Sequence, residues 1–135
     1  MSLHFNSYYG HRAQGAETYF LSREASDQLA AAAAATENLA GGEPDPELDL
    51  KLILWDLAQT YHLAESQRFA NLVQEELNLT LGLRDRGVKQ APFLVLMGAT
   101  MPAVLVELGF LSNPEEEAKL RSPIYQAELV DSPRN

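Results

Sequence analysis

Residues 102–113 read PAVLVELGFLSN, an apolar run with one carboxylate, Glu107, in its middle. The run lacks the alternation of a half-exposed strand, so residues 103–108 are expected to form a strand covered on both faces. Burying an ionised carboxylate costs several kcal/mol unless something compensates it. Two interpretations of Glu107 therefore stay open. It is either a functional residue near a strand's carboxyl end, where ligands collect in α/β sheets, or half of a structural ion pair.

The residues after this strand carry the signals of a helix start. Gly109 marks the expected end of the strand. Asn113 has the position of an N-cap, Pro114 belongs to the first turn, and Glu116 is placed to reach back to the cap. We expect a short helix over residues 114–121, so the local order is strand, loop, helix.

Composition limits the class of protein. The chain has 135 residues, the size of one ordinary domain, and 46% hydrophobic with 21% charged residues is typical of a globular protein. A net charge of −9 leaves no basic surface for phosphates, so neither a nucleic acid nor an anionic membrane is an expected partner. No apolar run approaches the length of a membrane span, about 18 residues. The first residues of the given sequence lack the charged segment and apolar core of a secretion signal, and we expect the natural protein to continue upstream of Met1.

The first part of the chain predicts two strands and a helix. Residues 1–9 alternate, with Leu3 on one side and His4 on the other, and residues 17–21 are rich in strand-forming side chains. A hairpin between these strands is one arrangement. Ser22 is the expected cap of a helix that runs through the following alanine tract and stops at the glycine pair 41–42.

The middle of the chain predicts further helices. The EPDP segment at residues 43–46 is a stiff acidic link, with Asp45 as cap and Pro46 as the first residue of a second helix. Apolar residues keep helical spacing over 50–61 and again over 69–77. Whether these are two helices or one bent helix stays open.

The remaining segments predict a loop and another strand. Residues 83–90 contain Arg84, Arg86 and Lys89, and a solvated loop is preferred over a patch that meets an acidic substrate. Residues 93–96 read FLVL and are expected to form a second buried strand. Too few residues separate it from the Glu107 strand for a parallel crossover. The predicted fold is α/β, with a mixed sheet flanked by helices.

Metal ligands must come from histidine and carboxylates, because the chain has three histidines and no cysteine. His4 lies on the polar side of its strand and is a candidate ligand, although a lone histidine is more often a surface or packing residue. Solvent exposure is the default for His11 and His62. No nucleotide-binding loop, HExxH pair or serine-nucleophile elbow is present, so serine catalysis has no support.

Several strings together resemble a known family: SLHFNS, GAETYFLS, ATENLAGG, LILWDLAQ, SQRFANLV, FLVL and MPAVLVELGFLSNPEEEAKL. They are similar to the catalytic domain of the zinc-dependent N-acetylmuramoyl-L-alanine amidases. Those enzymes hydrolyse bacterial peptidoglycan at the amide joining N-acetylmuramic acid to the L-alanine of the stem peptide. The resemblance covers essentially the whole chain, and the string containing Glu107 is its most specific part.

The resemblance implies particular residues. In the family one zinc ion is held by His, Glu and His, and a second Glu acts on the metal-bound water. His4 matches the second zinc histidine and Glu107 the catalytic glutamate. The other two ligands lie upstream of the segment that matches SLHFN, so they are absent here. Replacement by His11 or Glu17 is the less favoured alternative, because neither occupies a family ligand position. We therefore expect residues 1–135 to be a single domain that is the carboxyl-terminal part of a catalytic domain, inactive alone.

The resemblance also implies partners. Peptidoglycan is the expected substrate, in the periplasm or outside the cell, and some relatives are released from an autoinhibitory helix by an activator protein. The matching region here, residues 41–49, is too short for such a helix to be expected. A sheet left incomplete at its N-terminal side favours self-association through an exposed edge. The alternatives are a non-catalytic wall-binding or interaction module, and a metallohydrolase acting on another amide.

Overall fold

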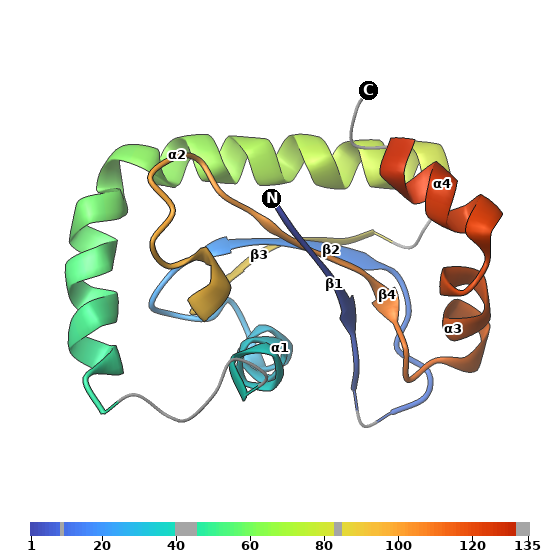
Figure 1. The fold of residues 1–135 in the computed structure, drawn as a ribbon, viewed down its shortest axis with the longest axis horizontal. Helices are drawn as coiled ribbons and strands as arrows, with labels where there is room; N and C mark the ends of the chain where they lie inside the picture. Colours follow the sequence, from blue (N-terminus) through green and yellow to red (C-terminus); the bar gives the residue numbers. More distant parts are fainter. Residues whose placement is uncertain (9, 40–45, 83–84, 132–135) are drawn as a thin grey trace.

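A computed structural model describes residues 1–8, 10–39, 46–82 and 85–131, without the side chains of residues 56 and 58–60. A β-sheet lies between two helical layers (Figure 1). The strands are β1 (Ser2–Asn6), β2 (Ala16–Leu21), β3 (Asp85–Ala91) and β4 (Leu105–Phe110). The helices are α1 (Gln28–Leu39), α2 (Leu48–Leu81), α3 (Pro114–Leu120) and α4 (Pro123–Asp131), with a 3₁₀ turn η1 (Leu94–Leu96).

The sheet is mixed, as predicted, and its strand order is β1-β4-β2-β3. β4 runs parallel to β1 and antiparallel to β2, while β2 and β3 are parallel. The hairpin considered for the first two strands is wrong, because β4 lies between them. β1 and β3 are the edges of the described sheet.

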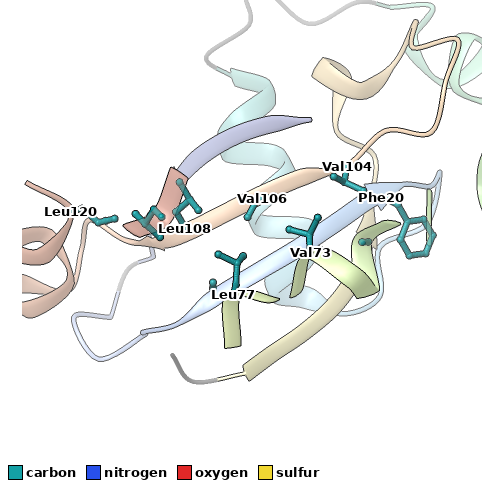
Figure 2. Packing of buried hydrophobic residues seen from close by; sticks show 10 residues of the cluster. Phe20, Val73, Leu77, Val104, Val106, Leu108 and Leu120 are labelled. Atoms are coloured by element: carbon teal, nitrogen blue, oxygen red, sulfur yellow. The ribbon is translucent and has the colours of Figure 1, made fainter. Parts of the chain in front are cut away.

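Each face of the sheet has its own apolar core. On one face, α2, α3 and α4 pack against β2 and β4, and Figure 2 shows Val73 and Leu77 of α2 beside Phe20 and Val106. On the other face, α1 and η1 cover Tyr19 and Leu105. α1 packs closely because the residues that it buries are alanines.

The predicted strand and helix around Glu107 are confirmed. All six residues of β4 are buried, and the Asn113 side chain accepts hydrogen bonds from the backbone N–H groups of Glu115 and Glu116. The Glu116 side chain does not bond back to the N-cap residue of α3, however. Its Oε1 accepts from the N–H groups of Gly15 and Phe110, at 2.9 and 3.1 Å, and so ties α3 to the strand and to the loop before β2.

The predicted helix starts were partly wrong. The first turn of α1 is capped by Asp27, whose Oδ1 accepts from Ala30 N at 2.8 Å, whereas the Ser22 hydroxyl accepts from Glu24 N. α2 begins at Leu48, two residues after Pro46. The glycine pair and Asp45 lie outside the described residues. The two predicted middle helices are a single helix, which bends (Figure 1).

Two segments differ in kind from their predictions. Residues 85–91 form strand β3 rather than a loop, and an extra residue near Gly87, whose φ is +81°, interrupts the pairing with β2. Such a bulge breaks the alternation by which a strand is recognised. Residues 93–96 are not a strand, because Leu96 N and Met97 N bond back to Phe93 O and Leu94 O. A short apolar run does not distinguish a strand from a helical turn.

Candidate functional site

Three neighbouring strands place their chemistry-bearing residues in one row across the sheet. His4 of β1 pairs in register with Glu107 of β4, and Glu107 pairs with Glu17 of β2. Directly paired residues on adjacent strands project to the same face. Because Leu105 and Tyr19, two positions along, pack against α1, this row also faces α1.

Glu107 is the most deeply buried member of the row. Its side chain is 0% exposed, and neither carboxylate oxygen has a hydrogen-bond partner among the described residues. Burial, followed by the negative charges of Glu37 and Glu17, raises its pKa to about 8. The ion pair considered for Glu107 has no cation in the described part of the chain.

The buried charge of Glu17, in contrast, is compensated by hydrogen-bond donors. Arg86 Nε donates to its Oε1, and the Tyr19 hydroxyl donates to its Oε2. The Arg86 guanidinium also lies over the Phe110 ring, 5.0 Å from the centroid. Burial and the charge of Glu17 raise the pKa of Tyr19 far above its usual range. A cavity of about 190 Å³ adjoins this pair and is also lined by Asn6 and Phe110.

His4 is held by both ring nitrogens. Its Nδ1 lies 2.7 Å from Oε2 of Glu37, which comes from the last turn of α1, and its Nε2 lies 2.8 Å from the Ser2 hydroxyl. The side chains of His4 and Glu37 are 24% and 18% exposed. Through this contact with His4, Glu37 of α1 joins the row of strand residues.

The other candidates lie apart from this row. His11 is exposed, and its Nδ1 is 2.9 Å from the backbone oxygen of Ser112. His62 is half-buried on α2, with its ring beside that of Tyr61. Sequence reasoning missed the contacts of Glu37 and Arg86 with the row. Their only signal was membership of the ATENLAGG string and of a basic segment.

The metal that the resemblance implies is zinc, which needs several ligands close together. No group of three or more His, Asp or Glu side chains in the described ranges is arranged to hold a metal ion. Catalytic zinc takes three protein ligands, and His4 is one candidate. Glu17 is occupied by Arg86 and Tyr19, and His11 does not join the row. The described residues thus do not form a zinc site by themselves.

The comparisons with known proteins identify the family. The site pairs a buried carboxylate with a histidine on adjacent strands of a mixed α/β sheet, and the family model described as N-acetylmuramoyl-L-alanine amidase matches residues 1–134. The chain belongs to this amidase family, which confirms the resemblance seen in the sequence.

Individual relatives agree. AmiA of Escherichia coli (strain K12) is 32% identical over 136 residues, covering 96% of this chain and 47% of AmiA. The crystal structure of the amidase from Clostridium difficile 630 matches with a TM-score of 0.64 and 26% identity, over 97% of this chain and 50% of that one. The CwlD amidase of Clostridioides difficile, solved with the GerS lipoprotein, has a TM-score of 0.64 at 21% identity, over 98% of this chain and 48% of that one. The last match supports the fold alone.

The matches cover nearly all of this chain but only part of each relative. The chain spans about half the length of AmiA and of both solved chains. None of the helices in the described ranges is long and apolar enough to cross a membrane.

Proposed function

We propose that residues 1–135 are the carboxyl-terminal part of one zinc-dependent amidase catalytic domain. The complete domain cleaves the amide between N-acetylmuramic acid and the L-alanine of the peptidoglycan stem peptide. One observation carries this proposal. In a chain that matches the family over residues 1–134, the residues that match its second zinc histidine and its catalytic glutamate, His4 and Glu107, are register partners on adjacent strands.

The environment of Glu107 supports a role in proton transfer. A carboxyl that is buried and without a cation retains its proton into the neutral range, and its pKa is raised to about 8. General acids and bases work best with a pKa near the operating pH. The remaining two zinc ligands are proposed to come from residues upstream, so this chain alone has no hydrolase activity.

The test compares release of stem peptide from purified peptidoglycan by this chain and by a polypeptide extended upstream by a length similar to its own. Release by the extended polypeptide, and none by its Glu107→Gln variant or by residues 1–135 alone, is the expected result. Binding to peptidoglycan without any release by the extended polypeptide would instead establish the non-catalytic wall-binding module. Release of another amide product would establish a different metallohydrolase.

The family also suggests where the chain acts and with what. Peptidoglycan is the proposed substrate, and the periplasm or the cell exterior is the proposed location. CwlD was solved with a lipoprotein. An accessory or activator protein is therefore a proposed partner, detected as a change in the release rate when the candidate partner is added to the extended polypeptide.

The edge strand β1 supports the incomplete-domain proposal. In the described sheet β1 is paired on one side only, with β4. Leu3 pairs with Val106, so the apolar face that α2 covers over β2 and β4 continues onto β1. There Leu3 and Phe5 are 51% and 45% exposed. An open edge with an apolar face is a template for pairing with another chain.

Residues 1–135 are accordingly expected to self-associate. Replacing both Leu3 and Phe5 by Thr removes apolar area while keeping strand propensity, and it should shift the chain toward monomer. Ile124→Thr, at an α4 position that is 75% exposed, serves as the control and should leave association unchanged. Sedimentation over a range of concentrations measures the difference. A well-behaved monomer of the unsubstituted chain with a high melting temperature would contradict this expectation.

A further inference from the structure

The cavity of about 190 Å³ begins where the row of His4, Glu107 and Glu17 ends. Two of its walls, Asn6 and Phe110, are register partners at the carboxyl ends of β1 and β4. Glu17 lines the cavity and also pairs with Glu107. In α/β sheets ligands collect at the carboxyl ends of parallel strands. The cavity is therefore placed to hold one group of a ligand whose other atoms reach Glu107.

The charges around the cavity cancel. Among the described residues that line it, the charged side chains are Arg86 and Glu17, which are 15% and 2% exposed and bond to each other. An anionic ligand would leave water to lie beside the Glu17 carboxylate, and a cationic one would lie beside the Arg86 guanidinium. Neither would gain a net counter-charge to offset its loss of water. The lining thus favours a neutral ligand with polar atoms.

The polar side chains of the lining supply both donors and an acceptor. The backbone N–H of Ser7 donates to Asn6 Oδ1 at 2.8 Å, which identifies the oxygen of this amide and leaves its NH₂ group to donate. The Arg86 guanidinium has five N–H donors, and described residues accept two of them, at Glu17 Oε1 and Gln14 O. The Glu17 carboxylate accepts two hydrogen bonds at about four lone-pair sites. A ligand group that both accepts and donates, such as an amide, matches this set.

The remaining walls are apolar and small. The Phe110 ring is 3% exposed, and the Arg86 guanidinium lies over it. Ala13 and Ala33 have only methyl side chains, and Leu29 of α1 is 37% exposed. A volume of about 190 Å³ is below the roughly 300–1,000 Å³ of pockets that hold whole small molecules, so the cavity has room for one group of a larger ligand. A methyl group beside the amide would cover Leu29 and the Phe110 ring.

The segment that joins β1 to β2 forms a further wall, and the start of α3 holds it in place. Tyr8 N donates to Ser112 Oγ at 3.1 Å, and the Asn113 amide donates to Ala13 O at 3.3 Å. Tyr8 and Ala13 both line the cavity. A wall that is fixed before binding reduces the ordering cost that a ligand must offset.

We propose that this cavity is a subsite for a methyl-bearing amide of the substrate. Asn6 and Arg86 donate to the carbonyl oxygen of that amide, and Glu17 accepts from its N–H. Its methyl group lies against Leu29 and Phe110. This inference deepens the proposed function and rests on it. The proposed substrate carries such chemistry twice, in the acetamido group of N-acetylmuramic acid and in the L-alanine joined to it.

Titration of ¹⁵N-labelled residues 1–135, followed by amide chemical shifts, tests the subsite with two neutral probes. N-acetylglucosamine presents the acetamido group on a sugar, and N-lactoyl-L-alanine amide presents the alanine. We expect at least one probe to give saturable shifts at Asn6, Ala13 and Phe110, with a dissociation constant in the millimolar range.

Each probe has a matched control compound. Glucose has no amide and should give no saturable shift at these residues. N-lactoyl-glycine amide lacks the alanine methyl group. If the alanine occupies the subsite, the glycine compound should bind about fourfold more weakly, as the loss of one buried methyl group predicts.

A pair of substitutions tests the location. Ala13→Leu fills the cavity while the backbone oxygen of residue 13 keeps its bond to Asn113, and it should weaken binding of the probe about tenfold or more. Ala35→Leu, at an exposed position of α1, is the control and should leave binding unchanged.

Saturable shifts with either probe support the subsite, and the tighter of the two identifies the group of the substrate that occupies it. The absence of saturable shifts at the lining residues with both probes overturns the proposal, even if Ala13→Leu fails to fold. Unchanged binding by a folded Ala13→Leu variant also overturns it. Binding is read without zinc or hydrolysis. An extended polypeptide that releases no stem peptide would therefore count against the proposed function, while the titration still decides the role of the cavity.

Discussion

Replacing Glu107 by Gln is expected to make the chain more stable at pH 8 and above, and to remove a fall in stability between acidic and neutral pH. The folded-state pKa is about 8, against 4.5 for the unperturbed group. Between these values the folded chain holds a proton that the unfolded chain has lost. The stabilisation is therefore complete below about pH 4.5 and is lost as the pH rises through the folded pKa. The slope approaches about 1.4 kcal/mol per pH unit.

The groups around Glu107 favour its neutral form, and hence a stability that falls as the pH rises. His4 faces it from β1, Glu17 and Tyr19 from β2, and Glu37 from α1, while the nearby cation, Arg86, is bonded to Glu17. Gln has the shape of the neutral carboxyl and does not ionise.

Urea unfolding from pH 5 to 9 measures the difference between the two chains. Glu115→Gln, an exposed position in the first turn of α3, is the control and should follow the pH dependence of the unsubstituted chain. Equal pH slopes for the Glu107→Gln variant and the unsubstituted chain would show that Glu107 is ionised throughout this range.

Arg86→Met is expected to cost about 3–5 kcal/mol of unfolding free energy, the range found when one partner of a buried ion pair is removed. The side chains of Arg86 and Glu17 are 15% and 2% exposed. Without the guanidinium, Glu17 lies uncompensated beside Glu107, and the contact over the Phe110 ring is lost. Urea unfolding at neutral pH gives the value.

Two further variants sharpen this test. Arg121→Met removes an exposed pair with Glu117 and should cost no more than about 0.5 kcal/mol. Arg86→Met combined with Glu17→Gln should recover part of the loss, because the buried charge is removed with its partner. A loss for Arg86→Met as small as that for Arg121→Met would contradict the buried pair.

The features that the sequence predicted correctly are those specified locally. A continuous apolar run identified β4 as doubly covered, and Asn113 and Pro114 marked the start of α3 within a few residues. These signals act over one or two turns of chain, where backbone and side-chain preferences are decided by near neighbours.

The features that the sequence did not predict depend on contacts between segments that are far apart in the chain. His4 and Glu107 are neighbours only because β4 inserts between β1 and β2, a choice that no residue spacing specifies. β3 was misread because its bulge at Gly87 and its edge position remove the regular alternation. The acidic Glu37 in an alanine-rich helix carries no local sign that its helix end lies over the sheet. For Glu37 the family resemblance supplied the only indication.

Zinc content per chain, by elemental analysis after dialysis, tests the central claim most directly. It is measured on residues 1–135 and on the upstream-extended polypeptide. We expect almost no zinc in the former and about one zinc per chain in the latter, since a catalytic site takes three protein ligands and this chain supplies one candidate. Near-stoichiometric zinc in residues 1–135 alone would contradict the account, because the ligands that complete the site would then lie within this chain.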